Sequence, residues 1–435
     1  MGFVLLRQIF SRELGVNKFP TFCAVLIGGF SFAQKPVDGL FSSLLGPSHT
    51  RLSSIRRKRL ATFVSALLAA WTAFTLLTRE QIPEKDDGPN HASQLDTRTT
   101  SQKLKPSKTQ KSILAGRTID LTLFAVTRAA DIVVGRLWSK RKSRRITTGK
   151  WTNVDSFIGG KTDAAVFAVS AGMIMWTWFY NPDSLPRTYN KWIREAAQVD
   201  DRLVEALRRA RHGQFVYGKE TGQSPLLQSM CKDYDWPLEW GNPAQVIPIP
   251  CEMVHMGVGK SCEMHVASRF VKAFKFALTM YLPVSLLMRA RSPSAEGFQR
   301  AFKNAIRSSA FLGTFISLFY YSVCLSRTRL GPKIFGPETV SPQMWDSGLD
   351  VGAGCATCGW SILLEAEPRR HELAFFVAPR AAATFFPRRY DPKYQWRETL
   401  AFTLSAAVIL TGAQENSRHV RGVFGRLLQQ VLGTS

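Results

Sequence analysis

The chain has 435 residues, of which 57 are Lys or Arg and 32 are Asp or Glu, so its formal net charge is +25. The basic residues flank long apolar runs and do not form a separate basic domain with interleaved aromatic residues, which argues against nucleic acid as a partner. Basic clusters beside apolar runs instead favour anionic lipid headgroups, and here they include residues 56–59 and 140–145.

Three charge-free runs of nineteen residues predict membrane-spanning helices: 60–78, 164–182 and 308–326. A helix of that length rises about 30 Å, which is the thickness of the hydrocarbon core of a bilayer. The mean hydropathy is slightly negative, but only because the polar residues are concentrated elsewhere. We therefore predict an all-α, polytopic helical membrane protein. The alternative is a large soluble α-helical protein with buried core helices.

Other charge-free runs are shorter. They reach span length only if the charged side chains at their ends extend to the membrane interface or if neighbouring helices bury the runs. These runs are 19–34, 276–288, 351–364 and 399–414.

The segment after the first long run is polar. Residues 79–111 contain no aromatic side chain, and Ile82, Leu95 and Leu104 are their only large apolar residues. Such a stretch cannot bury enough apolar surface to offset its conformational entropy, so we predict a disordered linker. The next segment, 119–138, has helical periodicity but carries charges that must lie at an interface, inside the helix bundle or along the membrane surface.

Two arginines in apolar surroundings, Arg128 and Arg380, hold equivalent positions in the repeat described below. An intramembrane charge indicates a functional site by default, and a carboxylate such as Asp120 or Glu372 would be its partner. The alternative is that each arginine extends from a helix end to the membrane interface.

Residues 193–250 connect the two halves of the chain, 1–192 and 251–435. Near its start, apolar side chains recur at helical spacing opposite charged ones, which predicts an amphipathic helix lying on the bilayer or on a partner. These side chains belong to Trp192, Ala196, Val199, Leu203, Leu207 and Ala210. Residues 213–250 contain five prolines and are predicted to form a loop.

The apolar pattern of the first half recurs in the second. Arg59 and Arg79 bracket nineteen charge-free residues, and Arg307 and Arg327 bracket another nineteen. Three further pairs of segments match in the same order and at nearly constant spacing: 35–37 with 282–284, 117–130 with 369–382, and 167–172 with 402–407. We interpret this as the internal duplication of a membrane unit of three to four helices.

The second half adds a segment rich in small residues. Gly348, Gly352 and Gly359 recur along it and predict a face where another helix packs closely. Cys355 and Cys358 lie in the same segment. They could form a redox pair, but a dithiol active site needs access to solvent, so packing is the preferred interpretation.

Four soft ligands lie close together at the start of the second half: Cys251, His255, Cys262 and His265. Gly257 and Gly259 separate the two pairs and would permit a tight turn. Two thiolates and two imidazoles match a tetrahedral structural zinc site, although the spacing is not that of a common zinc finger. A Cys251–Cys262 disulfide or ordinary free thiols are the alternatives.

Around these residues the chain resembles the cysteine-rich region of the transmembrane protein 135 family. The resemblance rests on the Pro250–His255 segment with Cys262, on 278–283, on 307–312 and on 362–370. It implies a multi-spanning protein of peroxisomes and mitochondria that is linked to mitochondrial dynamics and lipid handling. The helical units of that family are distantly similar to the pore-type subunits of mitochondrial translocases.

The sequence contains no phosphate-binding loop, nucleophile elbow or zinc-protease motif, so we do not expect an enzyme. Two functions remain. One is a non-enzymatic organiser of a peroxisomal or mitochondrial membrane that binds protein partners through its loops. The other is a channel or carrier for lipid-like or small solutes at the interface between the repeats. A polar cavity there, lined by Arg128 and Arg380, would favour the carrier.

Overall fold

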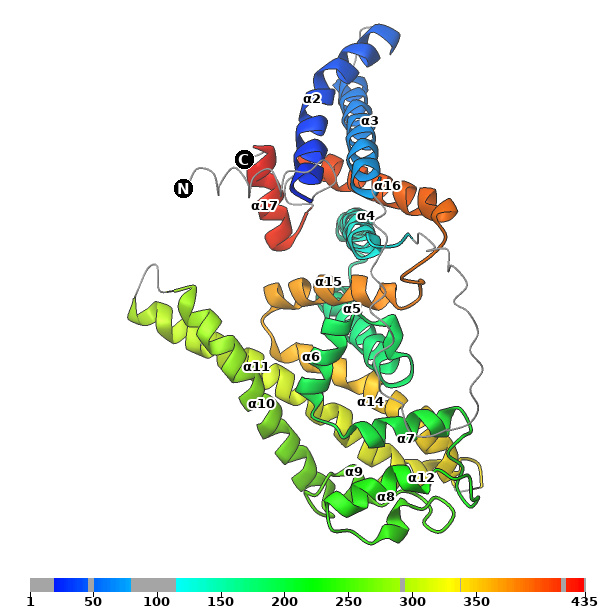
Figure 1. Cartoon of the computed structure of the whole chain (residues 1–435). Coiled ribbons are helices and arrows are strands. Elements are labelled where there is room, and N and C mark those ends of the chain that lie inside the picture. The colour runs from blue at the N-terminus through cyan, green and yellow to red at the C-terminus, as the bar shows by residue number, and fades with distance from the viewer. Residues whose placement is uncertain are drawn as a thin grey trace, which may run out of the picture. The chain divides into compact units, whose positions relative to one another are not determined.

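The computed structural model of the chain describes residues 19–45, 51–79, 115–289, 294–336, 338–415 and 420–433 (Figure 1). Regular structure in these residues is helical, apart from one isolated β-bridge between Ala115 and Tyr390. The predicted all-α class is therefore confirmed for this part of the chain. Apart from Arg79, the linker predicted at 79–111 lies outside the described residues.

The described residues form two compact units. Unit 1 comprises those of Met1–Ser139 and Pro387–Ser435, and unit 2 comprises those of Lys140–Phe386. Each unit therefore combines segments from both halves of the sequence.

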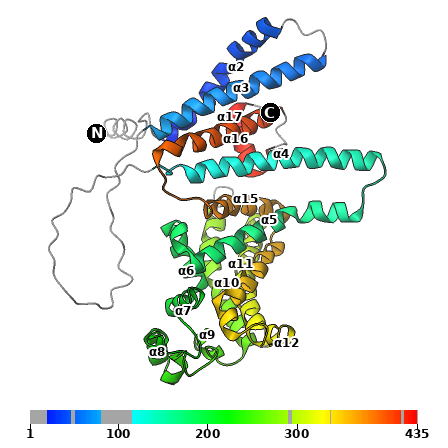
Figure 2. The same ribbon diagram turned by 90° about the vertical axis from the view of Figure 1, so that its right-hand side faces the viewer.

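Unit 1 is built on a hairpin of two long helices, α2 (Phe19–Leu45) and α3 (Arg51–Thr78). The helix α16 (Gln395–Glu415) packs along α3, and unit 1 also contains α17 (Gly422–Leu432) and the part of α4 (Ile119–Thr147) up to Ser139 (Figure 2). Buried alanines on α3 allow its neighbours to approach closely. Phe74 of α3 stacks on Phe402 of α16 with ring centroids 4.5 Å apart.

Unit 2 also contains a hairpin of long helices, α10 (Cys262–Leu287) and α11 (Ala295–Cys324). The helices α14 (Asp350–Cys358) and α15 (Glu367–Ala383) pack against α5 (Asn153–Tyr180). Side chains of Ser261 and Ser294 cap the first turns of α10 and α11 by accepting hydrogen bonds from backbone amides. A reciprocal pair, Thr152 and Asp155, caps α5 in the same way.

Shorter helices connect these long ones: α6 (Arg187–Ala197), α7 (Asp201–Arg211), α8 (Ser224–Asp233), α9 (Cys251–Val254), α12 (Gly331–Ile334) and α13 (Pro342–Met344). The single amphipathic helix predicted after Trp192 is in fact two helices, α6 and α7. The chain breaks at Gln198, which adopts a left-handed conformation with φ of +48°, and Asp200 caps the next helix. The predicted loop at 213–250 contains α8, which begins with Pro225 in its first turn.

Among the residues that the structure describes, four helices are long and apolar enough to cross a membrane: Ser54–Thr78, Asn153–Tyr180, Cys262–Leu287 and Ala295–Arg329. Each of three helices corresponds to one predicted nineteen-residue run. Ser54–Thr78 and Ala295–Arg329 contain their runs in full, and Asn153–Tyr180 contains all but the last two residues of its run. The fourth extends the shorter run 276–288 back to Cys262. By contrast, α14 has nine residues and is too short to span a bilayer alone.

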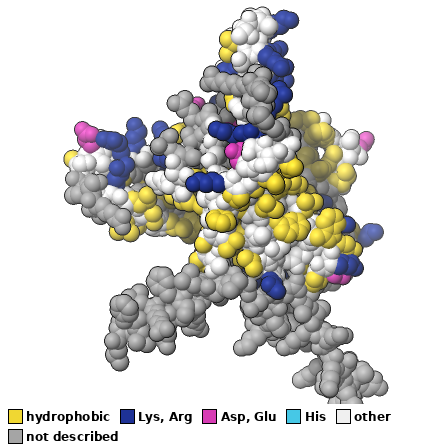
Figure 3. Space-filling model, turned by 90° about the horizontal axis from the view of Figure 1, so that it is seen from above, with side chains coloured by type: hydrophobic (Ala, Val, Ile, Leu, Met, Phe, Trp, Pro, Cys, Tyr) yellow, Lys and Arg dark blue, Asp and Glu magenta, His cyan; other side chains and the backbone are white. Residues whose placement is uncertain are grey.

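The candidate spans expose large apolar side chains. On α10 these include Val271, Met280, Val284 and Leu287, which are 44–75% exposed. Figure 3 shows hydrophobic side chains gathered in broad areas of the surface seen there, with Lys and Arg side chains near them. Exposed apolar patches of this kind are typical of surfaces that meet a membrane or a protein partner.

Candidate functional site

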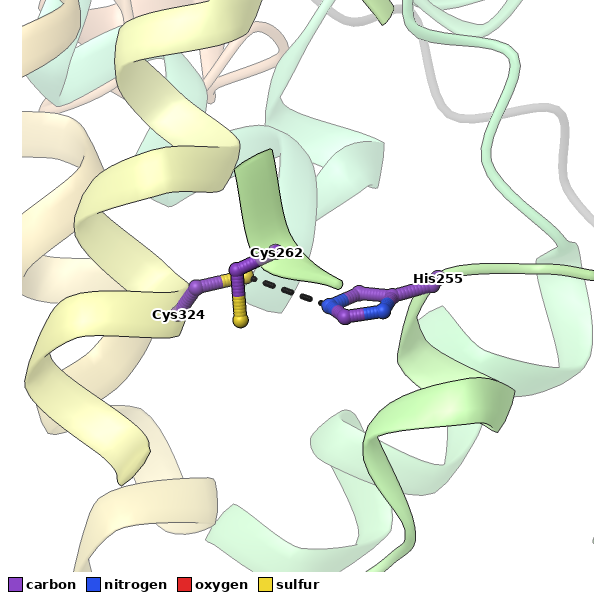
Figure 4. Close-up of side chains that lie close together, drawn as sticks. All are labelled: His255, Cys262 and Cys324. Carbon is purple, nitrogen blue, oxygen red and sulfur yellow. Dashed lines mark hydrogen bonds between the residues drawn. The ribbon is translucent and has the colours of Figure 1, made fainter. Parts of the chain in front are cut away.

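A cluster of soft ligands lies where three segments of unit 2 meet. Cys262 is the first residue of α10, Cys324 is the last residue of α11, and His255 follows α9. Their ligand atoms all lie within 4.8 Å of one another, and all three residues are buried. In Figure 4 the three side chains point toward one another. Thiolate and imidazole are ligand types that zinc prefers.

The imidazole of His255 is held in one orientation. Its Nδ1 lies 2.7 Å from the carbonyl oxygen of Gly259. A carbonyl oxygen can only accept, so Nδ1 carries a proton, and in the neutral ring the lone pair is therefore on Nε2. That Nε2 lies 3.5 Å from the Sγ of Cys324. A ring whose N–H binds a backbone carbonyl while its other nitrogen faces the ligand position is the usual arrangement of metal-binding histidines.

The turn that supplies this carbonyl depends on glycine. Gly257 and Gly259 have φ of +81° and +106°, a region that other residues rarely adopt. The predicted tight turn between the two ligand pairs is therefore present, and it places the Gly259 carbonyl beside His255.

Cys251 lies beside the cluster. It is half-buried at the start of α9, and its thiol interacts electrostatically with Cys262 and Cys324. Burial raises the pKa of the Cys251 thiol, while the nearby guanidinium of Arg327 lowers it. All seven cysteines of the chain are free thiols in the structure.

The fourth predicted ligand, His265, lies behind the cluster. Its ring stacks on that of His255 with centroids 4.6 Å apart and an angle of 19° between the planes. The rings of His265 and Tyr320 are perpendicular, with centroids 5.1 Å apart, and Arg269 lies over the Tyr320 ring. His265 thus supports the position of the His255 ring, while the third ligand group in the cluster comes from Cys324.

Sequence reasoning did not identify Cys324. A single cysteine in an apolar run has no local pattern, but the hairpin gives a usable signal. Because α10 and α11 are antiparallel and of similar length, the first residue of one must lie near the last residue of the other. Cys262 and Cys324 occupy those two positions.

A buried ion pair lies close to the cluster. Arg327 donates to Asp346 from Nε at 2.5 Å and from Nη2 at 2.9 Å, and the Tyr217 hydroxyl also donates to Asp346. Both members of the ion pair are less than 10% exposed. Burial and the neighbouring Asp346 raise the pKa of Asp350 to about 8. Such a network fixes the end of α11 relative to the segment that leads into α14.

An apolar pocket of about 590 Å³ lies between α5, α14 and the end of α15. Its lining includes Gly172, Trp176, Tyr180, Cys355 and Trp360. The hydroxyl of Tyr180 is buried and has no hydrogen-bond partner among the described residues.

The three predicted packing glycines have different environments. A Cβ on Gly359 would lie 2.4 Å from the Cα of Ala168, so this position requires glycine for close contact between α5 and the turn after α14. A Cβ on Gly352 would make an ordinary contact of 3.6 Å with Trp176. Gly348 has φ of +146° and lies at a kink, where glycine is needed for the backbone.

Arg128 and Arg380 lie in different units. Arg128 is 5% exposed, and its guanidinium lies over the rings of Phe124 and Phe424, 5.4 and 5.7 Å from their centroids. Arg380 lies 3.8 Å over the ring of Phe376 and donates to the carbonyl of that residue. Asp120, one of the proposed carboxylate partners, lies 3.5 Å from Arg388.

No family model matches the chain, and neither a curated protein nor a solved structure was found to match it.

Proposed function

We propose that the chain is a non-enzymatic integral membrane protein that organises a peroxisomal or mitochondrial membrane through partners bound at its loops. The four helices that are long and apolar enough to cross a bilayer are the observation that carries this proposal. The organelles follow from the resemblance of the cysteine-rich segment to the transmembrane protein 135 family. The basic clusters beside the spans suit anionic lipid headgroups.

We propose that the chain contains two copies of a four-helix unit. The helices α2, α3, α4 and α5 of the first copy correspond to α10, α11, α15 and α16 of the second. The position of proline supports this correspondence. Pro36 lies inside α2 and Pro283 lies inside α10, and proline is costly in the interior of a helix.

The two copies exchange their last helices under this correspondence. Phe402 of α16 stacks on Phe74 of α3, so the last helix of the second copy packs on the hairpin of the first. Conversely, Phe167 of α5 meets Phe311 of α11 edge-on with centroids 5.6 Å apart. Phe167 and Phe402 are equivalent positions of the sequence repeat. This reciprocity supports a common origin of the two halves.

Fractionation and localisation test the proposal together. The tagged chain should remain in the membrane pellet after alkaline carbonate extraction and should coincide with peroxisomal or mitochondrial markers. A soluble matrix protein of the same organelle, which is released by carbonate, is the control. Release of the chain into the supernatant contradicts membrane integration, and localisation to another membrane contradicts the organelle assignment.

The apolar pocket favours a second function, a carrier for lipid-like solutes. It lies between α5 of the first proposed copy and α14 of the second copy, and its mostly apolar lining includes the buried Tyr180 hydroxyl and the polar residues Thr177, Asn181 and Thr384. Neither Arg128 nor Arg380 lines this pocket.

A transfer assay separates the carrier from the organiser. The purified chain is reconstituted into vesicles, and movement of a fluorescent phospholipid between vesicles or leaflets is measured. Ala356 is exposed and lines the pocket, so Ala356→Trp should fill it and abolish transfer if the chain is a carrier. Leu363→Trp, at an exposed position outside the pocket, is the matched control. Absence of transfer by the unsubstituted chain contradicts the carrier.

A further inference from the structure

We propose that Cys251, His255, Cys262 and Cys324 bind one structural zinc ion that fastens the open end of the α10–α11 hairpin. Three of these residues already have their ligand atoms within 4.8 Å of one another in a buried site. The inference is independent of the proposed function in the membrane, because it concerns only the chemistry and position of these side chains.

The spacing of the ligands fits a tetrahedral zinc site. With Zn–S of about 2.3 Å and Zn–N of about 2.0 Å, a sulfur and a nitrogen ligand lie about 3.5 Å apart. The Sγ of Cys324 and the Nε2 of His255 are separated by 3.5 Å. An unligated thiol and imidazole can also reach this distance through a hydrogen bond; a metal would in addition account for the ligand atom of Cys262 within 4.8 Å of both.

The orientation of His255 is already that of a ligand. Its Nδ1–H donates to the Gly259 carbonyl, and its Nε2 faces the sulfur atoms. The stacked ring of His265 fixes the plane of the His255 ring from behind. Both contacts hold the ring in the same place with or without a metal, so the site is organised before zinc binds.

We assign Cys251 as the fourth ligand from its position. It lies one turn before His255 on the same short segment, beside the three residues whose ligand atoms lie within 4.8 Å of one another. A site with three thiolates and one imidazole has all four positions filled by protein, which is typical of structural zinc. On binding, each of the three thiols loses its proton to solvent.

The position of the ligands explains what the zinc would do. Cys262 begins α10 and Cys324 ends α11, so both lie at the end of the hairpin opposite to its connection. Cys251 and His255 belong to the segment that precedes α10. One ion would therefore join the two candidate spans to each other and to the polypeptide that leads into them.

Metal analysis of the full-length chain in detergent is the first test. After dialysis, elemental analysis should find about one zinc per chain. The same chain loaded with Co²⁺ should show the visible absorption of tetrahedral cobalt and the charge-transfer band of a thiolate ligand. A metal-free chain that also fails to bind added Zn²⁺ or Co²⁺ overturns the proposal, as does a disulfide among these cysteines that leaves two thiols missing under denaturing, non-reducing conditions.

Variants identify the ligands. Cys324→Ser should weaken the retention of zinc against a chelator by at least about tenfold. Cys23→Ser, which removes a half-buried thiol of unit 1, is the matched control and should retain the ion. His265→Gln should also retain it, because His265 stacks on a ligand and is not one itself. Loss of zinc with His265→Gln but not with Cys324→Ser overturns this ligand set.

A measurement on the unsubstituted chain covers the case in which Cys324→Ser does not fold. Alkylation of each cysteine is followed by mass spectrometry before and after removal of zinc by a chelator. Cys251, Cys262 and Cys324 should become reactive together, while Cys358, which is fully buried elsewhere in unit 2, should not change. Equal reactivity of the three thiols with and without the chelator overturns the proposal.

Discussion

The hairpin α2–α3 of unit 1 and the hairpin α10–α11 of unit 2 have similar lengths but different polar contacts. In the first, Arg57 and Asp38 form an ion pair at 3.7 Å in which the Asp38 side chain is 40% exposed. Just beyond the second, Arg327, three residues after α11, makes a two-point ion pair with Asp346, and both side chains are buried. Both hairpins consist of long apolar helices. Of the two ion pairs compared, only the one beside the second hairpin is buried.

Removal of one member of each ion pair should give the largest difference between the units. Asp346→Ala leaves a buried guanidinium without its carboxylate, and we expect a loss of about 3–5 kcal/mol in the free energy of unfolding. Asp38→Ala should cost about 1 kcal/mol or less, because a partly exposed pair contributes little. Denaturant unfolding in detergent, followed by tryptophan fluorescence, measures both. Equal losses would show that burial does not distinguish the two hairpins.

A glycine contact inside unit 2 should give the next largest effect. Gly359→Ala places a Cβ 2.4 Å from the Cα of Ala168, and backbone cannot move as easily as a side chain. We expect a loss of about 1–3 kcal/mol from overpacking. Gly352→Ala meets Trp176 at 3.6 Å and is the matched control, with little or no loss. The thermal stability of both variants in detergent tests this, and a larger loss for Gly352→Ala would contradict the contact.

The stability of unit 2 should depend on pH through Asp350. Its pKa is raised to about 8 in the folded state by burial and by Asp346, whereas an unfolded aspartate titrates near about 3.9. Between these values the folded state binds the proton more strongly, so the free energy of unfolding should fall as pH rises, by at most about 1.4 kcal/mol per pH unit. The stabilisation that the protonated Asp350 contributes is complete below about pH 4 and is lost as pH rises through 8.

Asp350→Asn should flatten this dependence, because an amide does not titrate. The control is Asp201→Asn on α7, an exposed position. Unfolding curves from pH 5 to pH 9 compare the variants. A slope that is the same in Asp350→Asn and in the unsubstituted chain would assign the dependence to other groups.

The sequence was sufficient to predict the helical class and the longest helices, because a charge-free run of span length has few alternatives. It underestimated α10, since Lys272 and Lys275 interrupt the apolar run. Those side chains are long enough to extend away from an apolar helix surface. The break between α6 and α7 was missed because a left-handed Gln198 has no sequence signal, although Asp200 is a good helix cap.

The cluster of soft ligands was predicted in part. Of its three residues, His255 and Cys262 are close in sequence, so their spacing was informative, and the glycines indicated the turn. Cys324 is brought to them only by the antiparallel hairpin, which is a tertiary contact. His265 has the right spacing on the chain, but one turn of helix directs it to the back of the His255 ring. Spacing alone cannot distinguish these two positions.

The smallest expected effect compares the two hairpins at a glycine within each. In α2, a Cβ on Gly29 would meet the Cβ of Ala69 at 3.5 Å, an ordinary contact, so Gly29→Ala should stabilise unit 1 by up to about 1 kcal/mol through higher helix propensity. In α11, a Cβ on Gly313 would lie 3.0 Å from the ring of Phe270 and 3.2 Å from its carbonyl. Because the carbonyl is backbone, the ring cannot relieve the contact alone, and Gly313→Ala should destabilise unit 2 by about 1 kcal/mol. A higher melting temperature for Gly29→Ala and a lower one for Gly313→Ala would confirm that the second hairpin is the more tightly packed at this position. Stabilisation by both substitutions would place the difference between the hairpins in their polar groups alone.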